Sequence, residues 1–358
     1  MALNDYVTLG RSGLRVSPLC LGTMTFGEDL GWGSSEADSR AILDRYLERG
    51  GNFIDTANVY TLGHSETILG DHLAATRKRD RVVLATKFYG NLFPGDPNGG
   101  GAGAKSLIGA CHESLRRLKT DYIDLLWMHA WDRHTPVEET LRALDDLVRA
   151  GKVRYLGFSD TPAWKVAQAQ TVAHFRNFAP LVALQIEYSL LERTVEGELI
   201  PMARELGLGV TPWSPLRSGV LSGKYTRDNK VKADRGVMVD SYLNERTYTI
   251  IDALIAIAKE RDTTPARVAL AWVQNQPGVT STIVGARTLE QLDQNLGALD
   301  VALSAAQLAK LDELSRPTLP FPVNFLSRAG SFMHGGISVN GDAAKPSPFG
   351  GTATSKRY

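Results

Sequence analysis

The sequence predicts a closed barrel of eight parallel strands, a (β/α)8 TIM barrel, with an N-terminal β-hairpin and a C-terminal extension. Short apolar runs alternate with amphipathic stretches along most of the 358 residues, which is the pattern of repeated strand–helix units. Eight such runs occur, and right-handed crossovers would close them into a barrel. An open doubly wound sheet is disfavoured because no Gly-x-Gly-x-x-Gly follows the first run; Gly10 and Gly13 come too early.

The eight predicted strands are short and rich in Val, Ile and Leu. They cover residues 19–23, 52–55, 82–87, 123–129, 153–159, 182–187, 209–213 and 280–284, and residues 1–17 before them predict the hairpin. Between strands, Thr135 followed by Pro136 and Glu138 predicts a helix start with an N-cap and a capping box. Further helices are predicted around 36–49, 251–258, 289–299 and 304–314.

The chain is predicted to divide into a barrel over residues 1–315 and a tail over residues 316–358. The tail is rich in Pro, Gly and Ser but carries four phenylalanines, Phe321, Phe325, Phe332 and Phe349. Disordered segments seldom contain so many large apolar side chains, so we expect the tail to pack on the barrel or on a partner subunit. The sequence is therefore compatible with a homo-oligomer.

Composition excludes several classes of protein. A formal net charge of +1 gives no electrostatic footprint for nucleic acid or an anionic membrane. Cys20 and Cys111 are the two cysteines, and both lie in apolar segments, which favours reduced thiols over a disulfide framework. No apolar run reaches membrane-spanning length and the N-terminus does not resemble a signal peptide. We expect a cytoplasmic protein.

Polar residues follow three successive predicted strands. Asp55 ends the second strand and Tyr60 follows it, Lys87 ends the third, and His129 ends the fourth. Each alone has a plainer explanation, such as a turn cap or a lysine that reaches solvent. Neighbouring strand ends of a parallel barrel share one mouth. We therefore expect the four side chains to converge there as a functional site.

These four residue types suit one kind of chemistry. A cation close to the Tyr60 phenol favours its ionised form and makes it a better proton donor. Lys87 would be that cation, Asp55 would keep it charged, and His129 would polarise a carbonyl oxygen. The set contains no nucleophile activated by a base, and the histidines lack metal-ligand spacing. Protonation of an oxyanion formed by hydride from a nicotinamide remains. A barrel glycosidase using Asp55 and Glu187 would leave Lys87 without a role.

The same segments resemble the aldo-keto reductase family. The resemblance runs from the opening residues to about Leu299 and is carried by residues 52–60, 63–70, 86–87 and 121–129. It implies the catalytic tetrad Asp55, Tyr60, Lys87 and His129. It also implies a (β/α)8 barrel and NAD(P)H-dependent reduction of aldehydes and ketones, reversible to alcohol oxidation, with hydride from nicotinamide C4 and a proton from Tyr60.

The resemblance further implies a cofactor site for NADPH, with NADH as the alternative. Ser159 and Asp160 stand where a Ser-Asn pair holds the nicotinamide carboxamide in the family. Gln185 matches the residue on the next strand that binds the same amide, and Trp213 matches the aromatic residue on which the nicotinamide ring stacks. Asp160 departs from the pattern, since an ionised carboxylate accepts hydrogen bonds but cannot donate them. The other implied contacts are Gly22, Thr23, Met24 and Asp55 at the first strand ends, Ser214, Pro215, Leu216, Gly219, Leu221 and Lys224 around the pyrophosphate, and Gly285, Arg287, Gln291, Gln294 and Asn295 at the adenosine end.

Two of the implied contacts bear on nucleotide choice. Arg287 would meet the 2′-phosphate and favour NADPH through charge-assisted pairing. Gln294 replaces a usual acid, so the contact there differs from the family pattern.

Aromatic residues near the mouth bear on the substrate. Phe26, Trp32, Phe88 and Trp131, with Tyr60 and His129, are expected to line it, and they favour a bulky, partly apolar carbonyl or alcohol. The sequence thus predicts an NADPH-dependent carbonyl reductase without a metal. The alternative is a nicotinamide-binding regulatory subunit of the same fold.

Overall fold

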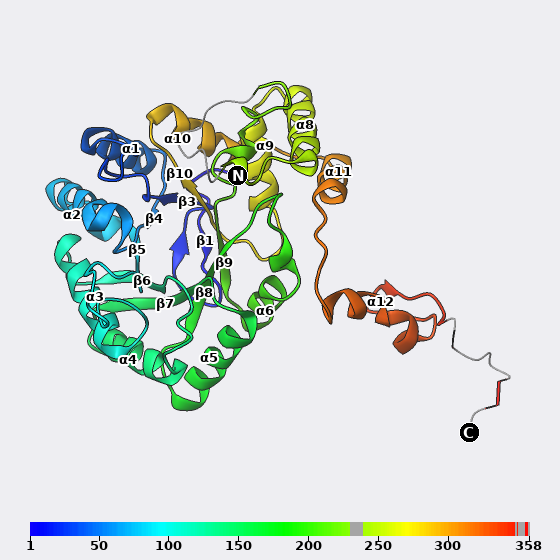
Figure 1. Ribbon diagram of the computed structural model, residues 1–358, viewed down its shortest axis with the longest axis horizontal. Helices are drawn as coiled ribbons and strands as arrows, with labels where there is room; N and C mark the ends of the chain where they lie inside the picture. The colour runs from blue at the N-terminus through cyan, green and yellow to red at the C-terminus, as the bar shows by residue number, and fades with distance from the viewer. Residues whose placement is uncertain (230–238, 348, 350–354, 357–358) are drawn as a thin grey trace.

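The computed structural model describes residues 1–229, 239–347, 349, 355 and 356. Eight parallel strands form one sheet in the order β10-β3-β4-β5-β6-β7-β8-β9 (Figure 1). β10 pairs with β3, and a parallel bridge between Val210 of β9 and Val279 just before β10 brings the remaining edges together. The predicted barrel is therefore confirmed.

Each strand lies within two residues of its predicted range. The strands are β3 Leu19–Gly22, β4 Phe53–Asp55, β5 Val83–Phe88, β6 Ile123–Met128, β7 Val153–Ser159, β8 Leu181–Glu187, β9 Gly209–Trp213 and β10 Thr282–Gly285. The helices that surround them are α1 Glu36–Glu48, α2 His64–Thr76, α3 Ala104–Arg117, α4 Val137–Arg149, α5 Ala163–Arg176, α6 Leu199–Leu206, α8 Glu245–Glu260, α9 Pro265–Gln274, α10 Leu289–Leu296 and α11 Ala305–Ser315.

Capping follows the sequence at some helices and not at others. Thr264 and Thr288 cap α9 and α10, and Ser304 forms a complete capping box with Gln307 on α11. The predicted cap at Thr135 is wrong. Its hydroxyl donates to Asp132 Oδ2 at 2.7 Å instead, so α4 starts after Pro136 without a side-chain cap.

A short hairpin seals one end of the barrel. β1 (Val7–Thr8) pairs antiparallel with β2 (Arg15–Val16), as the sequence predicts. Leu9 and Val16 are fully buried in the same apolar cluster as Phe53 and Trp127, which line the barrel interior. Since the N-terminal end is filled, polar chemistry is confined to the opposite end, where the strands terminate.

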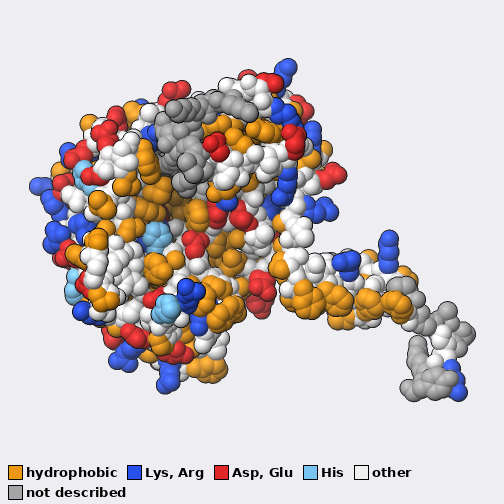
Figure 2. Space-filling view, in the orientation of Figure 1, with side chains coloured by type: hydrophobic (Ala, Val, Ile, Leu, Met, Phe, Trp, Pro, Cys, Tyr) orange, Lys and Arg blue, Asp and Glu red, His pale blue; other side chains and the backbone are white. Residues whose placement is uncertain are grey.

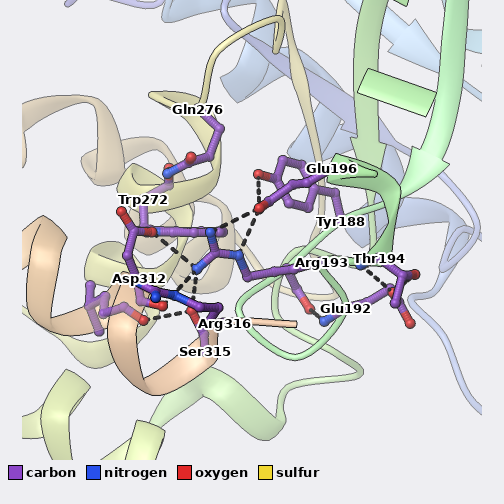
Figure 3. Close-up of polar contacts among 12 residues, drawn as sticks. Tyr188, Glu192, Arg193, Thr194, Glu196, Trp272, Gln276, Asp312, Ser315 and Arg316 are labelled. Carbon is purple, nitrogen blue, oxygen red and sulfur yellow. Dashed lines mark hydrogen bonds and ion pairs between the residues drawn. The ribbon is translucent and has the colours of Figure 1, made fainter. Parts of the chain in front are cut away.

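A buried arginine fixes α11 to the barrel (Figure 3). Arg193, in the loop after β8, bonds Glu196 Oε1 at 2.6 Å and Ser315 Oγ at 2.7 Å, and pairs with Asp312 at 3.1 Å. Its guanidinium also lies 4.8 Å above the Trp272 ring of α9. Through this arginine, α11 is joined to α9 and to the loop after β8.

Beyond α11 the chain leaves the barrel. α12 (Val323–His334) and the two-residue strands β11 (Ser338–Val339) and β12 (Asp342–Ala343) project from its side (Figure 1). No residue of α12 is buried, and Figure 2 shows a continuous hydrophobic stripe along the projection. That the tail packs on the barrel or on a partner subunit stays a prediction, and the exposed stripe favours the partner.

Removing residues 324–358 is expected to change the melting temperature by less than about 2 °C, because no side chain described in that segment is buried. Differential scanning calorimetry of the full and shortened chains measures this. Leu311→Ala, which empties a fully buried position of α11, is the positive control and should cost about 2–5 kcal/mol. A large fall on truncation would place the tail within the cooperative unit of the barrel.

Candidate active site

Alternation along the strands brings the predicted polar side chains to one place. Phe53, Ala85 and Trp127 belong to the cluster inside the barrel. Asp55, Lys87 and His129 each come two residues later and therefore face the same interior, one layer nearer the open end. In the strand register Asp55 lies opposite Ala85 and Lys87 opposite Trp127, so Lys87 comes two residues after the partner of Asp55 and His129 two residues after the partner of Lys87.

Lys87 is the centre of this layer. Its ammonium is fully buried and donates to the Asp55 carboxylate, to the Thr56 carbonyl at 2.9 Å and to the Tyr60 hydroxyl at 3.1 Å. Burial lowers the pKa of Lys87, but the charge of Asp55 and the bonds to Asp55 and Tyr60 outweigh it and raise the pKa overall. Lys87 is therefore a permanent cation.

The Tyr60 phenol stays protonated at neutral pH. Burial raises the pKa of Tyr60, whereas Lys87 lowers it; Asp55 and Asp160 raise it further, and the net direction is upward. Lys87 lowers the pKa of Tyr60, as the sequence predicts, but loss of solvation is the larger effect. Tyr60 therefore carries its proton, and a phenolate at this position would be stabilised by Lys87.

A strained turn positions Tyr60. It opens a short 3-10 helix, η1 (Tyr60–Gly63), in which Thr61 and Leu62 have φ of 46° and 58°. The Thr61 hydroxyl holds this turn by donating to Phe26 O at 2.8 Å and accepting from Ser65 N at 3.0 Å. Left-handed backbone at two adjacent non-glycine residues is costly and tends to occur at functional sites.

His129 completes the group as a neutral imidazole. Its ring stands edge-on to Tyr60, with centroids 5.8 Å apart. Burial lowers the pKa of His129 to about 3, and the nearby Lys87 cation lowers it too. A neutral ring keeps one N–H, which can donate to an oxygen atom in the mouth.

Gln185 joins this network in a way the sequence did not indicate. Its Nε2 donates to Asp55 Oδ1 at 3.0 Å, so the second carboxylate oxygen of Asp55 is satisfied from β8. The implied role of Gln185 as a nicotinamide contact is therefore shared with a structural one. No sequence signal marks such a pair, because the two residues are 130 positions apart.

The end of β7 carries the residues implied to bind the nicotinamide. Ser159 is buried and its hydroxyl makes no hydrogen bond of good geometry, although it lies near enough to Asp160 to lower the pKa of that carboxyl. Asp160 Oδ1 accepts from Trp213 Nε1 at 3.0 Å across the mouth. A buried, unsatisfied hydroxyl beside an acceptor and an indole ring fits a carboxamide and a flat ring.

The loop after β9 is wound in an unusual conformation. Ser214, Arg217 and Ser218 have φ of 53°, 47° and 55°, which few non-glycine residues adopt. Arg217 pairs with Glu187 of β8, and its guanidinium lies 4.2 Å above the Tyr242 ring. Because Glu187 is neutralised in this way and Asp55 is held by Lys87, the two carboxylates that the glycosidase hypothesis needs are both already paired.

The implied pyrophosphate and strand-end contacts surround the same mouth. In this loop Pro215 and Leu221 are buried, Leu216 and Gly219 are half-buried, and Lys224 is exposed beside Gly219. Gly22 and Thr23 are buried at the end of β3, while Met24 beyond them is 41% exposed.

The implied adenosine end has two kinds of residue. Gln291 Oε1 accepts from Arg287 N at 2.9 Å, and Asn295 Nδ2 donates to Gly285 O at 3.0 Å, so both side chains hold the local backbone. Gln294 differs, since its side-chain oxygen is buried and has no partner among the described residues. An unsatisfied acceptor at this position fits an amino group of a base.

Two predicted substrate residues are corrected. Phe26 and Phe88 are almost completely buried, each in a different apolar cluster of the barrel wall. Phe88 follows the inward-facing Lys87 and so points outward. The other two predicted aromatic residues are less buried. Trp32 is half-buried, and the ring of Trp131 stands edge-on to the ring of Trp164, with centroids 5.6 Å apart. Trp164, which is 59% exposed, was missed from sequence. Figure 2 shows the mouth as a hollow rich in hydrophobic side chains.

Comparison with known proteins identifies the family. The sequence profile of the Aldo/keto reductase family matches residues 18–316. The chain belongs to this family. None of the helices described for this reductase is long and apolar enough to cross a membrane.

Relatives of this aldo/keto reductase carry related names. An uncharacterized oxidoreductase of Bacillus subtilis is 41% identical over 320 residues, which are 87% of this chain and 95% of that protein. Norsolorinic acid reductase A of Aspergillus parasiticus is 36% identical over 88% of this chain and 82% of its own length. An aryl-alcohol dehydrogenase of Pestalotiopsis microspora is 36% identical over 88% and 83%. The protein is therefore an oxidoreductase of carbonyl and alcohol groups, in a family that generally uses nicotinamide nucleotides.

The neutral state of His129 predicts a pH-dependent stability. The pKa of His129 is about 3 in the folded chain against 6.5 for the free group, so the unfolded chain binds a proton below pH 6.5 that the folded chain does not. Stability from the neutral ring is present above pH 6.5 and is lost as the pH falls. Between pH 7 and 5 the free energy of unfolding of the wild type should fall by about 2 kcal/mol more than that of His129→Gln. Urea unfolding at both pH values measures this, and parallel losses would contradict a neutral His129.

Proposed function

We propose that this aldo/keto reductase reduces aldehydes and ketones with NADPH, reversibly, and that Tyr60 is the general acid. The observation that carries the proposal is the Lys87 ammonium, which holds the Asp55 carboxylate and lies 3.1 Å from the Tyr60 hydroxyl. Such an arrangement stabilises the charge that a phenol develops as it releases a proton.

The residues of the chain divide the work around a carbonyl oxygen. A bound nicotinamide nucleotide would supply the hydride. Tyr60 gives its proton to the oxygen, and Lys87 stabilises the phenolate left behind. The His129 N–H donates to the same oxygen and orients it toward Tyr60. In alcohol oxidation the Tyr60 phenolate takes the proton back.

The cofactor proposal rests on unsatisfied atoms and on charge. The Ser159 hydroxyl and the Gln294 side-chain oxygen lack hydrogen-bond partners, and they lie at the implied nicotinamide and adenosine ends. Arg287 stands directly before α10, whose N-terminus adds partial positive charge. A phosphate on the ribose would be favoured there, which supports NADPH over NADH.

Aromatic carbonyl compounds are the substrate class that the mouth supports best. Trp131 follows the strand end that carries His129 and stands edge-on to the exposed Trp164, and an aromatic substrate would gain from packing against such rings. The name of the aryl-alcohol dehydrogenase of Pestalotiopsis microspora agrees with this class. No feature of the structure favours the alternative, a regulatory subunit with little turnover.

A screen of aromatic aldehydes, ketones and the matching alcohols with both nucleotides tests the function. Loss or gain of reduced-nucleotide absorbance is the measurement. Turnover of an aryl carbonyl with NADPH is expected. Tight nucleotide binding without turnover of any compound would favour the regulatory subunit instead.

Tyr60→Phe is expected to lower the turnover number by at least about 100-fold, because the phenyl ring keeps its packing but has no proton to give. NADPH affinity, measured by calorimetric titration, should stay within about twofold, since the hydroxyl acts in the chemical step. Tyr6→Phe is the matched control, as Tyr6 donates to Gly50 O away from the mouth. Weakened NADPH binding as the main effect would refute this role for Tyr60.

Arg287→Ala is expected to reduce the ratio of NADPH affinity to NADH affinity by about 10-fold or more, the usual value of a charge-assisted contact. Both affinities are measured by the same titration. Arg142→Ala removes an arginine on the outer face of α4, where it pairs with Asp146, and should leave the ratio unchanged. An unaltered ratio in Arg287→Ala would move the 2′-phosphate contact elsewhere.

A further inference from the structure

The Asp160 carboxylate occupies a rigid position at the mouth. Its backbone is left-handed, with φ of 42°. The Asp160 N–H donates to Gln185 O at 3.1 Å, and its carbonyl accepts from Trp131 N at 3.4 Å. With Trp213 Nε1 bonded to Oδ1, neighbouring strand ends hold the residue from both sides.

This carboxylate has no ion-pair partner among the described residues. Lys87 is the nearby cation, but its three N–H bonds go to Asp55, Thr56 and Tyr60, and an ammonium has no fourth. The other groups at the mouth do not compensate, because His129 is neutral, Tyr60 is protonated and Asp55 is bound by Lys87 and Gln185. Asp160 therefore presents a negative charge that the protein itself leaves unpaired.

The charge is present at the pH of ordinary assays. Asp160 is exposed to the solvent in the mouth, although protein surrounds it on most sides. Loss of solvation raises its pKa to about 6, against the lowering effects of Trp213, Lys87 and Ser159. At pH 8 the carboxylate is ionised.

We propose that Asp160 makes the site bind the oxidised nicotinamide nucleotide in preference to the reduced one. The inference rests on the proposed nicotinamide site. The oxidised ring carries one positive charge and the reduced ring none. Covering an ionised carboxylate with a neutral ring removes its water without a counter-charge, whereas the oxidised ring supplies one. An asparagine in this place would accept the same carboxamide hydrogen bond from both forms and would not discriminate by charge.

The preference has a consequence for the direction of the reaction. A site that stabilises the oxidised nucleotide shifts the equilibrium between bound reactants toward the oxidised nucleotide and the alcohol, which is the direction of carbonyl reduction. The charge of Asp160 also raises the pKa of Tyr60. Asp160 therefore affects both the nicotinamide ring, which carries the hydride, and the Tyr60 phenol, which carries the proton. The overall equilibrium in solution is unaffected.

Calorimetric titration of the full-length protein with NADP+ and with NADPH at pH 8 tests the inference. In Asp160→Asn, which suits a left-handed residue, the ratio of the NADPH dissociation constant to the NADP+ dissociation constant should fall about 10-fold relative to wild type, through weaker binding of NADP+. Asp146→Asn removes the same charge on the outer face of α4 and should leave the ratio unchanged. If Asp160→Asn does not fold, Asp160→Ser takes its place with the same expectation.

The possible results separate the two proposals. An equal ratio in wild type and Asp160→Asn overturns the role of Asp160 but leaves the nicotinamide site intact. Failure of the wild type to bind either nucleotide overturns the proposed function itself. A lower ratio in the variant supports both.

Discussion

The buried ammonium of Lys87 is the constraint on which the site depends. A fully buried lysine is tolerated only when its charge is paired and its donors are used, and here Asp55, Thr56 and Tyr60 use all three. Those partners come from β4 and the turn after it, so the position of one nitrogen atom fixes the geometry of two neighbouring strand ends. Gln185 extends the same constraint to β8 by bonding the free oxygen of Asp55.

The barrel supplies this constraint through simple alternation. Apolar side chains such as Phe53, Ala85 and Trp127 fill the interior, and the hairpin closes the N-terminal end. The next layer of inward-facing side chains, which contains Asp55, Lys87 and His129, is polar because it is the last layer before the open end of the barrel. A single charged residue placed one layer deeper would lack partners, so the fold allows ionisable chemistry at only one end of the barrel.

The mouth contains two carboxylates with different roles. Asp55 is paired with the buried Lys87 cation and holds it in place. Asp160 has no such partner among the described residues and is exposed at the end of β7. Paired charges maintain a structure, whereas an unpaired charge at a mouth selects among ligands. The two strained turns also differ in what they position. The turn at Thr61 positions the Tyr60 phenol, and the turn that begins at Ser214 borders the implied pyrophosphate site.

The sequence by itself determined the barrel, its eight strands and the four polar residues at three strand ends, because periodicity and strand-end position are local features of the chain. It could not determine the burial of Phe26 and Phe88, the use of Thr135 by Asp132, or the bond between Gln185 and Asp55. Nor could it give the direction of the Tyr60 pKa, which depends on how much solvent the closed barrel removes. These properties were decided by tertiary structure, since each depends on which distant side chains the folded chain brings into contact.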